Sequence, residues 1–339
     1  MLRVPIESMA RMLFIILLAF LPIAVVGCSP LHEPAEISVV KEYSNNSIEM
    51  LFCPADKCFI KIYNLIEKSN SSIHCAFFSI DNKEIVNLLE LKSMDLDVKL
   101  VVDDSAYKKL NNLDFVHKDT TSQLMHNKFC IFDNNTVLAG SLNPTESAYS
   151  DNNNMLIFSS MNIAAAYESE FSELWDGYFG KKSSIRKENK LFYINEEKIE
   201  IYFCPEDWCT NKVLKELYAA NSSIHFMTYS FTSKQIAELL AEKLVQGLEV
   251  NGIIEKSQKN AYWQYDFLLN SSVKVILDKN SRLMHNKVFL IDNSTVITGS
   301  FNPTSNAEFN NDENLIIIHS PALAERYLKE FDYLYSLWS

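Results

Sequence analysis

Five residue types, four of which suit a phosphate group, recur together at two places in the chain. The first copy comprises His126, Lys128, Asp133, Ser141 and Asn143, and the second comprises His285, Lys287, Asp292, Ser300 and Asn302. Every member lies 159 residues from its counterpart. Ammonium, amide and hydroxyl groups donate hydrogen bonds to phosphate oxygens, and an imidazole can attack phosphorus or carry a proton. Each copy therefore resembles half of a phosphate site.

The repetition extends well beyond these residues. The segment from Phe52 to Cys58 matches the segment from Phe203 to Cys209, at an offset of 151 residues. The change of offset from 151 to 159 predicts about eight inserted residues in the second half, between Gln258 and Tyr265. We expect a first lobe over residues 48–180, a polar linker over 181–198 and a second lobe over 199–339.

Within each half, short apolar runs alternate with segments of helical periodicity, which is typical of an α/β fold. Strands are expected at 48–52, 73–80 and 128–132, with counterparts in the second half. An aromatic-rich helix closes each half, at 164–175 and 321–338. The prediction is two tandem, similar lobes, each a mixed β-sheet with helices on both faces.

The composition excludes several classes of function. The chain has 339 residues and a net charge of −12, which argues against capture of nucleic acid by electrostatics alone. Only seven residues are glycine, and neither a G-x-G-x-x-G nor a P-loop sequence is present. Dinucleotide binding and P-loop nucleotide binding are therefore not expected.

The amino-terminal segment is typical of an exported protein. Arg3 and Arg11 precede a 14-residue apolar run over 13–26 that is too short to span a membrane. Val25-Val26-Gly27-Cys28 resembles the lipobox of a prokaryotic lipoprotein. This resemblance implies a signal peptide over 1–27, a lipid on Cys28 and a tether over 28–47. The expected location is the extracytoplasmic face of a membrane.

Six cysteines remain after Cys28. Cys53 and Cys58, and likewise Cys204 and Cys209, form a C-P-x-D-x-C sequence in each half. Outside the cytoplasm these favour two short-range disulfides, and a zinc site is the alternative. Cys75 and Cys130 fall in predicted buried strands, as free thiols or as a pair on neighbouring strands.

The pattern H-x-K-x4-D-x6-G-S-x-N, present twice, resembles the motif of the phospholipase D superfamily. The resemblance covers roughly residues 48–339 and implies that the two motifs face each other across one site in a monomer. The implied reaction is metal-free and cofactor-free cleavage of a phosphodiester through a phosphohistidine. One imidazole attacks phosphorus, and the other protonates the leaving alcohol and then activates water.

The resemblance also implies a role for each motif residue. Lys128, Lys287, Asn143 and Asn302 would hold the non-bridging phosphate oxygens, and Ser141 and Ser300 would bind the same oxygens or a histidine. Asp133 and Asp292 would be structural. In relatives a carboxylate orients the histidine, and only the second copy has one at that place: Glu313, opposite Asn154 at the offset of 159. We therefore expect Glu313 to contact His285, and His126 to contact an amide or Asp151. The carboxylate favours His285 as the nucleophile, whereas many two-lobed relatives use the amino-terminal histidine, so the assignment stays open.

Several functions remain compatible with the sequence. The first is hydrolysis of a phospholipid head group, which the lipid anchor and the acidic charge favour. The second is cleavage of DNA or RNA, for which Lys108, Lys109, Lys118 and Arg282 could form a basic rim. A phosphatidyltransferase would use the same intermediate with an alcohol in place of water. A lipoprotein that only binds phosphate is disfavoured by the intact residue sets in both halves.

Overall fold

The computed structural model describes residues 40–42, 46–182 and 190–339. The expected signal peptide, Cys28 and most of the expected tether lie outside the described residues. Among the helices of the described part of the chain, none is both long and apolar enough to cross a membrane.

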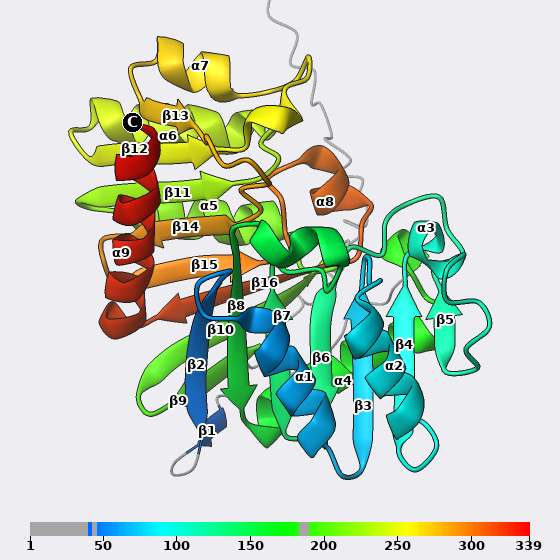
Figure 1. Ribbon diagram of the computed structural model, residues 1–339. Helices are drawn as coiled ribbons and strands as arrows, with labels where there is room; N and C mark the ends of the chain where they lie inside the picture. The colour runs from blue at the N-terminus through cyan, green and yellow to red at the C-terminus, as the bar shows by residue number, and fades with distance from the viewer. Residues whose placement is uncertain (1–39, 43–45, 183–189) are drawn as a thin grey trace, which may run out of the picture. The chain divides into compact units, whose positions relative to one another are not determined.

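The first lobe is built on a seven-stranded mixed sheet in the order β2-β8-β7-β6-β3-β4-β5 (Figure 1). Strands β3, β4 and β5 are parallel to one another, and the remaining neighbours are antiparallel. The elements are β2 (Ser47–Cys53), α1 (Cys58–Lys68), β3 (Ser72–Phe77), α2 (Lys83–Lys92), β4 (Asp97–Val102), α3 (Asp104–Tyr107), β5 (Val116–Lys118), β6 (Lys128–Phe132), β7 (Thr136–Gly140), the 3₁₀ turn η1 (Glu146–Ser150), β8 (Asn153–Ser159), α4 (Met161–Trp175) and the 3₁₀ turn η2 (Gly180–Lys182).

The second lobe repeats this plan in a nine-stranded sheet, β1-β9-β10-β16-β15-β14-β11-β12-β13. Its elements are β1 (Val40–Glu42), β9 (Leu191–Ile194), β10 (Glu197–Cys204), α5 (Cys209–Ala219), β11 (Ser223–Thr228), α6 (Lys234–Val245), β12 (Glu249–Ile254), the 3₁₀ turn η3 (Lys256–Gln258), α7 (Tyr265–Asn270), β13 (Lys274–Leu277), β14 (Lys287–Ile291), β15 (Thr295–Gly299), α8 (Ser305–Phe309), β16 (Glu313–His319) and α9 (Pro321–Trp338). The predicted class, two similar α/β lobes with mixed sheets, is confirmed.

The two closing helices pack in a core that both lobes share. One hydrophobic cluster contains side chains of both sheets together with those of α4 and α9, and Figure 1 shows α9 lying across the strands of the second sheet. Tyr167 of α4 meets Phe203 edge to face at 5.2 Å, and Tyr327 of α9 meets Phe52 in the same way at 5.0 Å. These crossed aromatic pairs join each closing helix to the other lobe, because edge-to-face rings attract one another beyond their burial.

Two boundaries differ from the prediction. The expected linker over 181–198 contains β9 and the start of β10, and the expected tether contains β1, which pairs with β9 in parallel. Strand β9 is an apolar segment, with Phe192 and Ile194 buried in the shared core, so the expected linker was extended too far beyond the polar residues that precede it. Strand β1 is short, and backbone pairing at a sheet edge needs only N–H and C=O groups. Residues 183–189 lie outside the described part.

Three disulfides are present among the described residues. Cys53–Cys58 and Cys204–Cys209 are the two predicted short-range bonds, and they preclude the alternative zinc site at these thiols. Cys75–Cys130 joins β3 to β6, where the two residues are directly opposite each other in the antiparallel register. Of the two alternatives for Cys75 and Cys130, free thiols or a pair, the structure shows the disulfide.

Gly140 offers a test of how closely β7 and β8 pack. A Cβ at this position would lie 2.3 Å from the carbonyl oxygen of Asn154. Gly140→Ala should therefore lower the free energy of unfolding by about 1–3 kcal/mol, because the backbone of β8 must move. Val245→Ala, at a side chain that is 86% exposed, should change it by less than about 0.5 kcal/mol. Thermal and chemical denaturation would measure both values, and equal stability of the two variants would contradict the prediction.

Candidate active site

The two motifs meet where each lobe pairs with the backbone of the other. Met125 forms a parallel bridge with Asp312, and Met284 forms one with Asn152. The amide of His126 donates to the carbonyl of Asp312 at 2.9 Å. The segment just before each motif strand, β6 or β14, is therefore held by the segment just before β16 or β8 of the opposite lobe.

Each imidazole is oriented through its Nδ1 atom by a side chain from the other lobe. His126 Nδ1 lies 2.8 Å from Glu313 Oε2, and His285 Nδ1 lies 2.9 Å from Asn153 Oδ1. Both acceptors are oxygens, so Nδ1 carries the proton in the neutral ring and Nε2 keeps its lone pair. Each histidine thus has the tautomer that a nucleophile at Nε2 requires.

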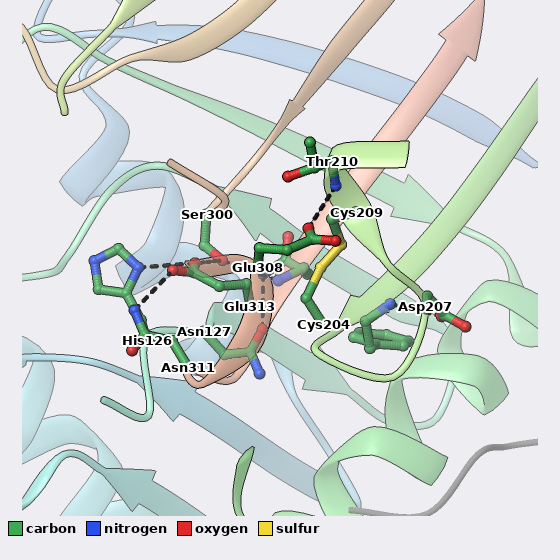
Figure 2. The surroundings of a disulfide bond; sticks show 12 residues. His126, Asn127, Cys204, Asp207, Cys209, Thr210, Ser300, Glu308, Asn311 and Glu313 are labelled. Carbon is green, nitrogen blue, oxygen red and sulfur yellow. Dashed lines mark hydrogen bonds and ion pairs between the residues drawn. A yellow bond between two sulfur atoms is a disulfide. The ribbon is translucent and has the colours of Figure 1, made fainter. Parts of the chain in front are cut away.

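The expected pairing of Glu313 with His285 is wrong, because the acceptors cross between the lobes. Glu313 follows the strand segment that pairs with Met125, so it reaches His126 (Figure 2). Asp151, the other carboxylate considered for His126, instead accepts from the amide of Leu283 at 3.1 Å. The counterpart of Glu313 is Asn153, not Asn154, since the second copy has one more residue between its Asn-Pro-Thr segment and β16.

The motif serines lie behind the histidines' partners. Ser300 Oγ donates to Glu313 Oε2 at 2.6 Å, and Ser141 Oγ donates to Asn153 Oδ1 at 3.0 Å. Both serines are fully buried, and each also accepts from a backbone amide of β8 or β16. This geometry makes them positioning residues and does not support the expected contact with substrate.

Two lysine ammonium groups are buried in the site. Lys128 Nζ donates to the carbonyl of His126 at 2.6 Å, and Lys287 Nζ donates to that of His285 at 2.7 Å. Burial lowers the pKa of Lys128 to about 7, and burial together with the charge of Lys128 lowers the pKa of Lys287. Each ammonium has three donors. A bound anion would therefore relieve an electrostatic cost that the protein carries alone.

The same charges act on the acid–base groups. Burial, reinforced by Lys128 and Lys287, lowers the pKa of both His126 and His285 below 6.5. Burial raises the pKa of Glu313, whereas the ammonium of Lys128 and the hydroxyl of Ser300 oppose the shift. The donors around the carboxylate, Ser300 at Oε2 and Asn311 at Oε1, favour its ionised form beside His126 Nδ1. Both imidazoles are thus neutral near pH 7 until an anion enters.

A cavity of 250 Å³ opens onto both histidines, and Asn143 is also in its wall. Asn302 lines an adjoining cavity of 690 Å³ that contains His126 as well, and its Oδ1 accepts from Ser230 at 3.3 Å. The two predicted asparagines therefore flank the histidines from opposite lobes, as the sequence predicted for amide donors to one phosphate.

Phe78 and Tyr229 are site residues that the motif did not include. Phe78 packs 5.2 Å from the ring of His126, and Tyr229 packs 4.7 Å from that of His285. Their rings also lie over the ammonium groups of Lys128 and Lys287, at 5.4 and 5.0 Å. Both occupy the same place in the repeat, 151 residues apart, so an aromatic residue shared by the two halves was the available signal.

Asp133 and Asp292 lie away from the site, at the far end of the motif strands. Each carboxylate accepts from three consecutive backbone amides at the start of β3 or β11, and each residue has a positive φ in the turn that follows its strand. Asn154 donates to Thr298 Oγ1 and to the hydroxyl of Tyr327 across the lobe boundary. All three residues make structural hydrogen bonds, but Asp133 and Asp292 do not lie near the site, where they were expected.

Two of the four residues of the expected basic rim, Lys109 and Lys118, are paired with carboxylates. Lys109 pairs with Asp81 at 2.8 Å, and Lys118 pairs with Asp104 at 2.6 Å. A polyanion would have to displace these carboxylates, which weakens the case for nucleic acid.

One group of potential metal ligands occurs among the described residues, formed by Glu200, Glu216 and His319. The ammonium of Lys198 already donates to Glu200 at 2.5 Å, and His319 does so at 3.2 Å. The ammonium of Lys198 therefore already offsets the negative charge of Glu200. None of these residues lines the cavity that contains His126 and His285.

A family model described as "Cardiolipin synthase, PLD-like domain" matches residues 62–175 and 213–335, one copy in each lobe. The chain belongs to the phospholipase D-like family.

Individual relatives agree with this assignment. The chain is 32% identical over 146 residues to a phospholipase D of Rickettsia conorii, which covers 43% of this chain and 73% of that protein. It is 28% identical over 123 residues to the mitochondrial cardiolipin hydrolase of Mus musculus, covering 36% and 56%. The fold is similar to that of the phosphatidylserine synthase of Haemophilus influenzae, with a TM-score of 0.64 at 13% identity over 85% of each chain. These relatives support an enzyme of the phosphodiesterase type.

Glu313→Gln tests the contact between Glu313 and His126. The variant keeps the shape of the side chain but removes the negative charge that stabilises an imidazolium. Turnover of bis(p-nitrophenyl) phosphate should fall on the order of 10²-fold, and the acid limb of its pH profile should move to lower pH. Asn153→Asp is the matched control, since it adds a carboxylate at His285 and should move that imidazole's pKa upward. An unchanged rate and pH profile in Glu313→Gln would contradict this role.

Proposed function

We propose that the chain is a metal-independent phosphodiesterase that hydrolyses a phospholipid at its head-group phosphodiester through a phosphohistidine. The observation that carries the proposal is the pair of imidazoles on one cavity, each with Nδ1 bound to an oxygen acceptor and flanked by a buried lysine. A single imidazole cannot both attack phosphorus and protonate the leaving group in one step.

His126 is assigned as the nucleophile. Its Nε2 forms the bond to phosphorus while the bond from phosphorus to the leaving alcohol breaks, and the phosphorylated ring then carries a positive charge. Glu313 lies 2.8 Å from Nδ1 of that ring and stabilises the charge.

His285 is assigned as the general acid. Its partner, Asn153, is neutral, so its imidazolium is less stabilised than that of His126 and releases its proton more readily to the alcohol. In the second step His285 accepts a proton from water as the water oxygen attacks phosphorus and His126 leaves.

The buried lysines prepare the site for the transition state. Lys128 and Lys287 lower the histidine pKa values while the site is empty. The incoming phosphodiester offsets their charge, so binding raises those pKa values and permits His285 to be protonated. Ammonium and amide donors fixed around the phosphate then stabilise the charge that grows on its oxygens, each donor contributing about 3 kcal/mol.

Phospholipid is favoured over nucleic acid for three reasons. The relatives named above act on lipids by name, the net charge is −12, and the lysines of the expected basic rim are paired with carboxylates. We further propose that Cys28 carries a lipid and that the chain works on the extracytoplasmic face of a membrane. Three disulfides are consistent with such an oxidising compartment.

The substrate class is tested with the full chain purified in detergent, in the presence of EDTA. Mixed phospholipid vesicles should release head groups, whereas supercoiled plasmid should stay intact. His126→Ala and His285→Ala should each lower the rate by at least about 10³-fold. His117→Ala is the matched control, because that ring stacks on Trp175 away from the site.

The intermediate offers a second readout for the same variants. The His285→Ala variant can still form the intermediate from a phosphatidyl ester of p-nitrophenol, because that leaving group needs no protonation. With this ester labelled in its diacylglycerol part, rapid denaturation should trap label on the peptide that contains His126, because no base remains to activate water. Nicked plasmid with untouched lipid would overturn the proposed substrate, and label on His285 of the unmodified chain would overturn the assignment of the nucleophile.

The pH dependence follows from the buried charges. Lys128 loses its proton in the free enzyme above pH about 7, so kcat/KM should fall as pH rises through that value. On the acid side kcat/KM should fall only below 6.5, because the pKa of each histidine is lowered. The kcat profile, which reports the complex, should extend to higher pH because bound phosphate raises the lysine pKa. Identical alkaline limbs for kcat and kcat/KM would contradict this account.

A further inference from the structure

A groove runs from the histidines across the second lobe. The 690 Å³ cavity beside His126 continues into a second cavity of 350 Å³, and both are lined by Thr232, Thr304 and Ser305. Trp208 and Phe309 stand in the wall of the second cavity. We call this second cavity the Trp208 groove. A group attached to the reacting phosphate can therefore extend into it.

At the equivalent place in the first lobe, a stacked pair of aromatic rings occupies the space. There the ring of Phe59 stacks on Tyr149 at 4.0 Å, and Phe59 is buried. In the second lobe Thr210 replaces Phe59 and Phe309 replaces Tyr149. The smaller Thr210 leaves the space that the Phe59 ring fills, so the groove is a specific difference between two copies of one fold.

Trp208 is presented rigidly at the edge of this groove. It precedes α5 in the left-handed conformation, with φ 56°, next to the Cys204–Cys209 disulfide shown in Figure 2. Its indole meets Phe309 edge to face at 6.2 Å and remains 55% exposed. The corresponding residue of the first lobe is Lys57. An exposed indole held by a short disulfide-bonded turn loses little freedom when a ligand packs on it.

The lining of the groove is polar but almost uncharged. Besides the two aromatic rings, it consists of hydroxyl and amide side chains, one lysine and one glutamate: Thr210, Asn211, Thr232, Ser233, Lys234, Gln235, Thr304, Ser305 and Glu308. Lys234 lies 3.4 Å from Glu238, and Glu308 accepts from the amide of Thr210 at 2.6 Å (Figure 2). A carboxylate thus already occupies the amino-terminal end of α5, and a second phosphate or a polyanion would be repelled there.

We propose that the Trp208 groove binds a neutral, polyhydroxylated ring attached to the reacting phosphate, such as a sugar or cyclitol head group. The C–H face of such a ring carries slight positive charge and packs on the negative face of the indole. Its hydroxyls exchange hydrogen bonds with the threonine, serine and amide side chains, which fix its orientation. This inference rests on the proposed function and names the head-group class for the same site.

Binding is tested separately from turnover with the His126→Ala variant of the full chain. Titration calorimetry would compare glycerophosphoinositol with glycerophosphoethanol, which has the same phosphate but neither a polyhydroxylated ring nor a charge in its head group. The inositol compound should bind at least about 10-fold more tightly. Trp208→Ala should remove this difference, whereas Lys57→Ala, its counterpart in the first lobe, should preserve it. Equal affinities for the two compounds, or an unchanged preference in Trp208→Ala, would overturn the proposal even if no lipid is hydrolysed.

A second variant closes the groove by copying the first lobe. Thr210→Phe should lower kcat/KM for phosphatidylinositol by about 10-fold. The kcat/KM for bis(p-nitrophenyl) phosphate, which has no polyhydroxylated ring, should stay within about twofold of its original value. Circular dichroism and the melting temperature would verify that the variant folds. Loss of activity on both substrates in the folded variant would overturn the inference, and a wild-type chain that hydrolyses no lipid would instead count against the proposed function. Tight binding of a single-stranded oligonucleotide that depends on Trp208 would show that the groove binds a nucleobase instead of a polyhydroxylated ring. That result would also overturn the inference.

Discussion

The site depends on a reciprocal exchange of backbone hydrogen bonds between the lobes. His126 and Asp312, and likewise His285 and Asn152, are joined through main-chain groups. Backbone pairing fixes the position of a residue more firmly than a side-chain contact does, because it restricts two dihedral angles per residue and leaves no rotamer free. Each lobe therefore supplies a histidine but relies on the other lobe for its orientation. Neither lobe carries a complete half-site alone.

This exchange explains why two lysines can remain buried in the same region. A buried ammonium with few partners is costly, and two of them near each other are more so. The shared core of α4 and α9 with both sheets stabilises the structure enough to hold them. The cost is recovered when a phosphate enters, since the anion then meets donors that are already in place. The folded protein therefore has donors for an anion in place before the anion binds.

The two halves of the site are nearly symmetric, but they differ in the side chains that contact the two imidazoles. Glu313 stands behind one imidazole and Asn153 behind the other, and Ser300 and Ser141 hold them by matching hydrogen bonds. A second asymmetry lies farther out, where Thr210 and Trp208 open a groove that Phe59 fills in the first lobe. The duplicated frame places both imidazoles on one cavity, while the differences give His126 a carboxylate partner and form a groove on the second lobe.

The sequence by itself determined the repeated α/β architecture and the residues that meet at the centre. Apolar periodicity is a local property, and the duplicated spacing of His126 and His285 is visible in the order of residues alone. The short disulfides were equally accessible, since each closes a loop of few residues.

Only the tertiary structure decided how the two halves are combined. It placed Glu313 on His126 rather than on His285, directed the motif serines to Glu313 and Asn153, and added β1 and β9 to the second sheet. The contact of Glu313 with His126 and the pairing of β1 with β9 join residues more than 100 positions apart, and the serine contacts depend on the register of neighbouring strands. A one-residue difference before β16 was enough to misalign the partners. Spacing along the chain therefore identifies the reacting groups, whereas their pairing follows from which strands lie side by side.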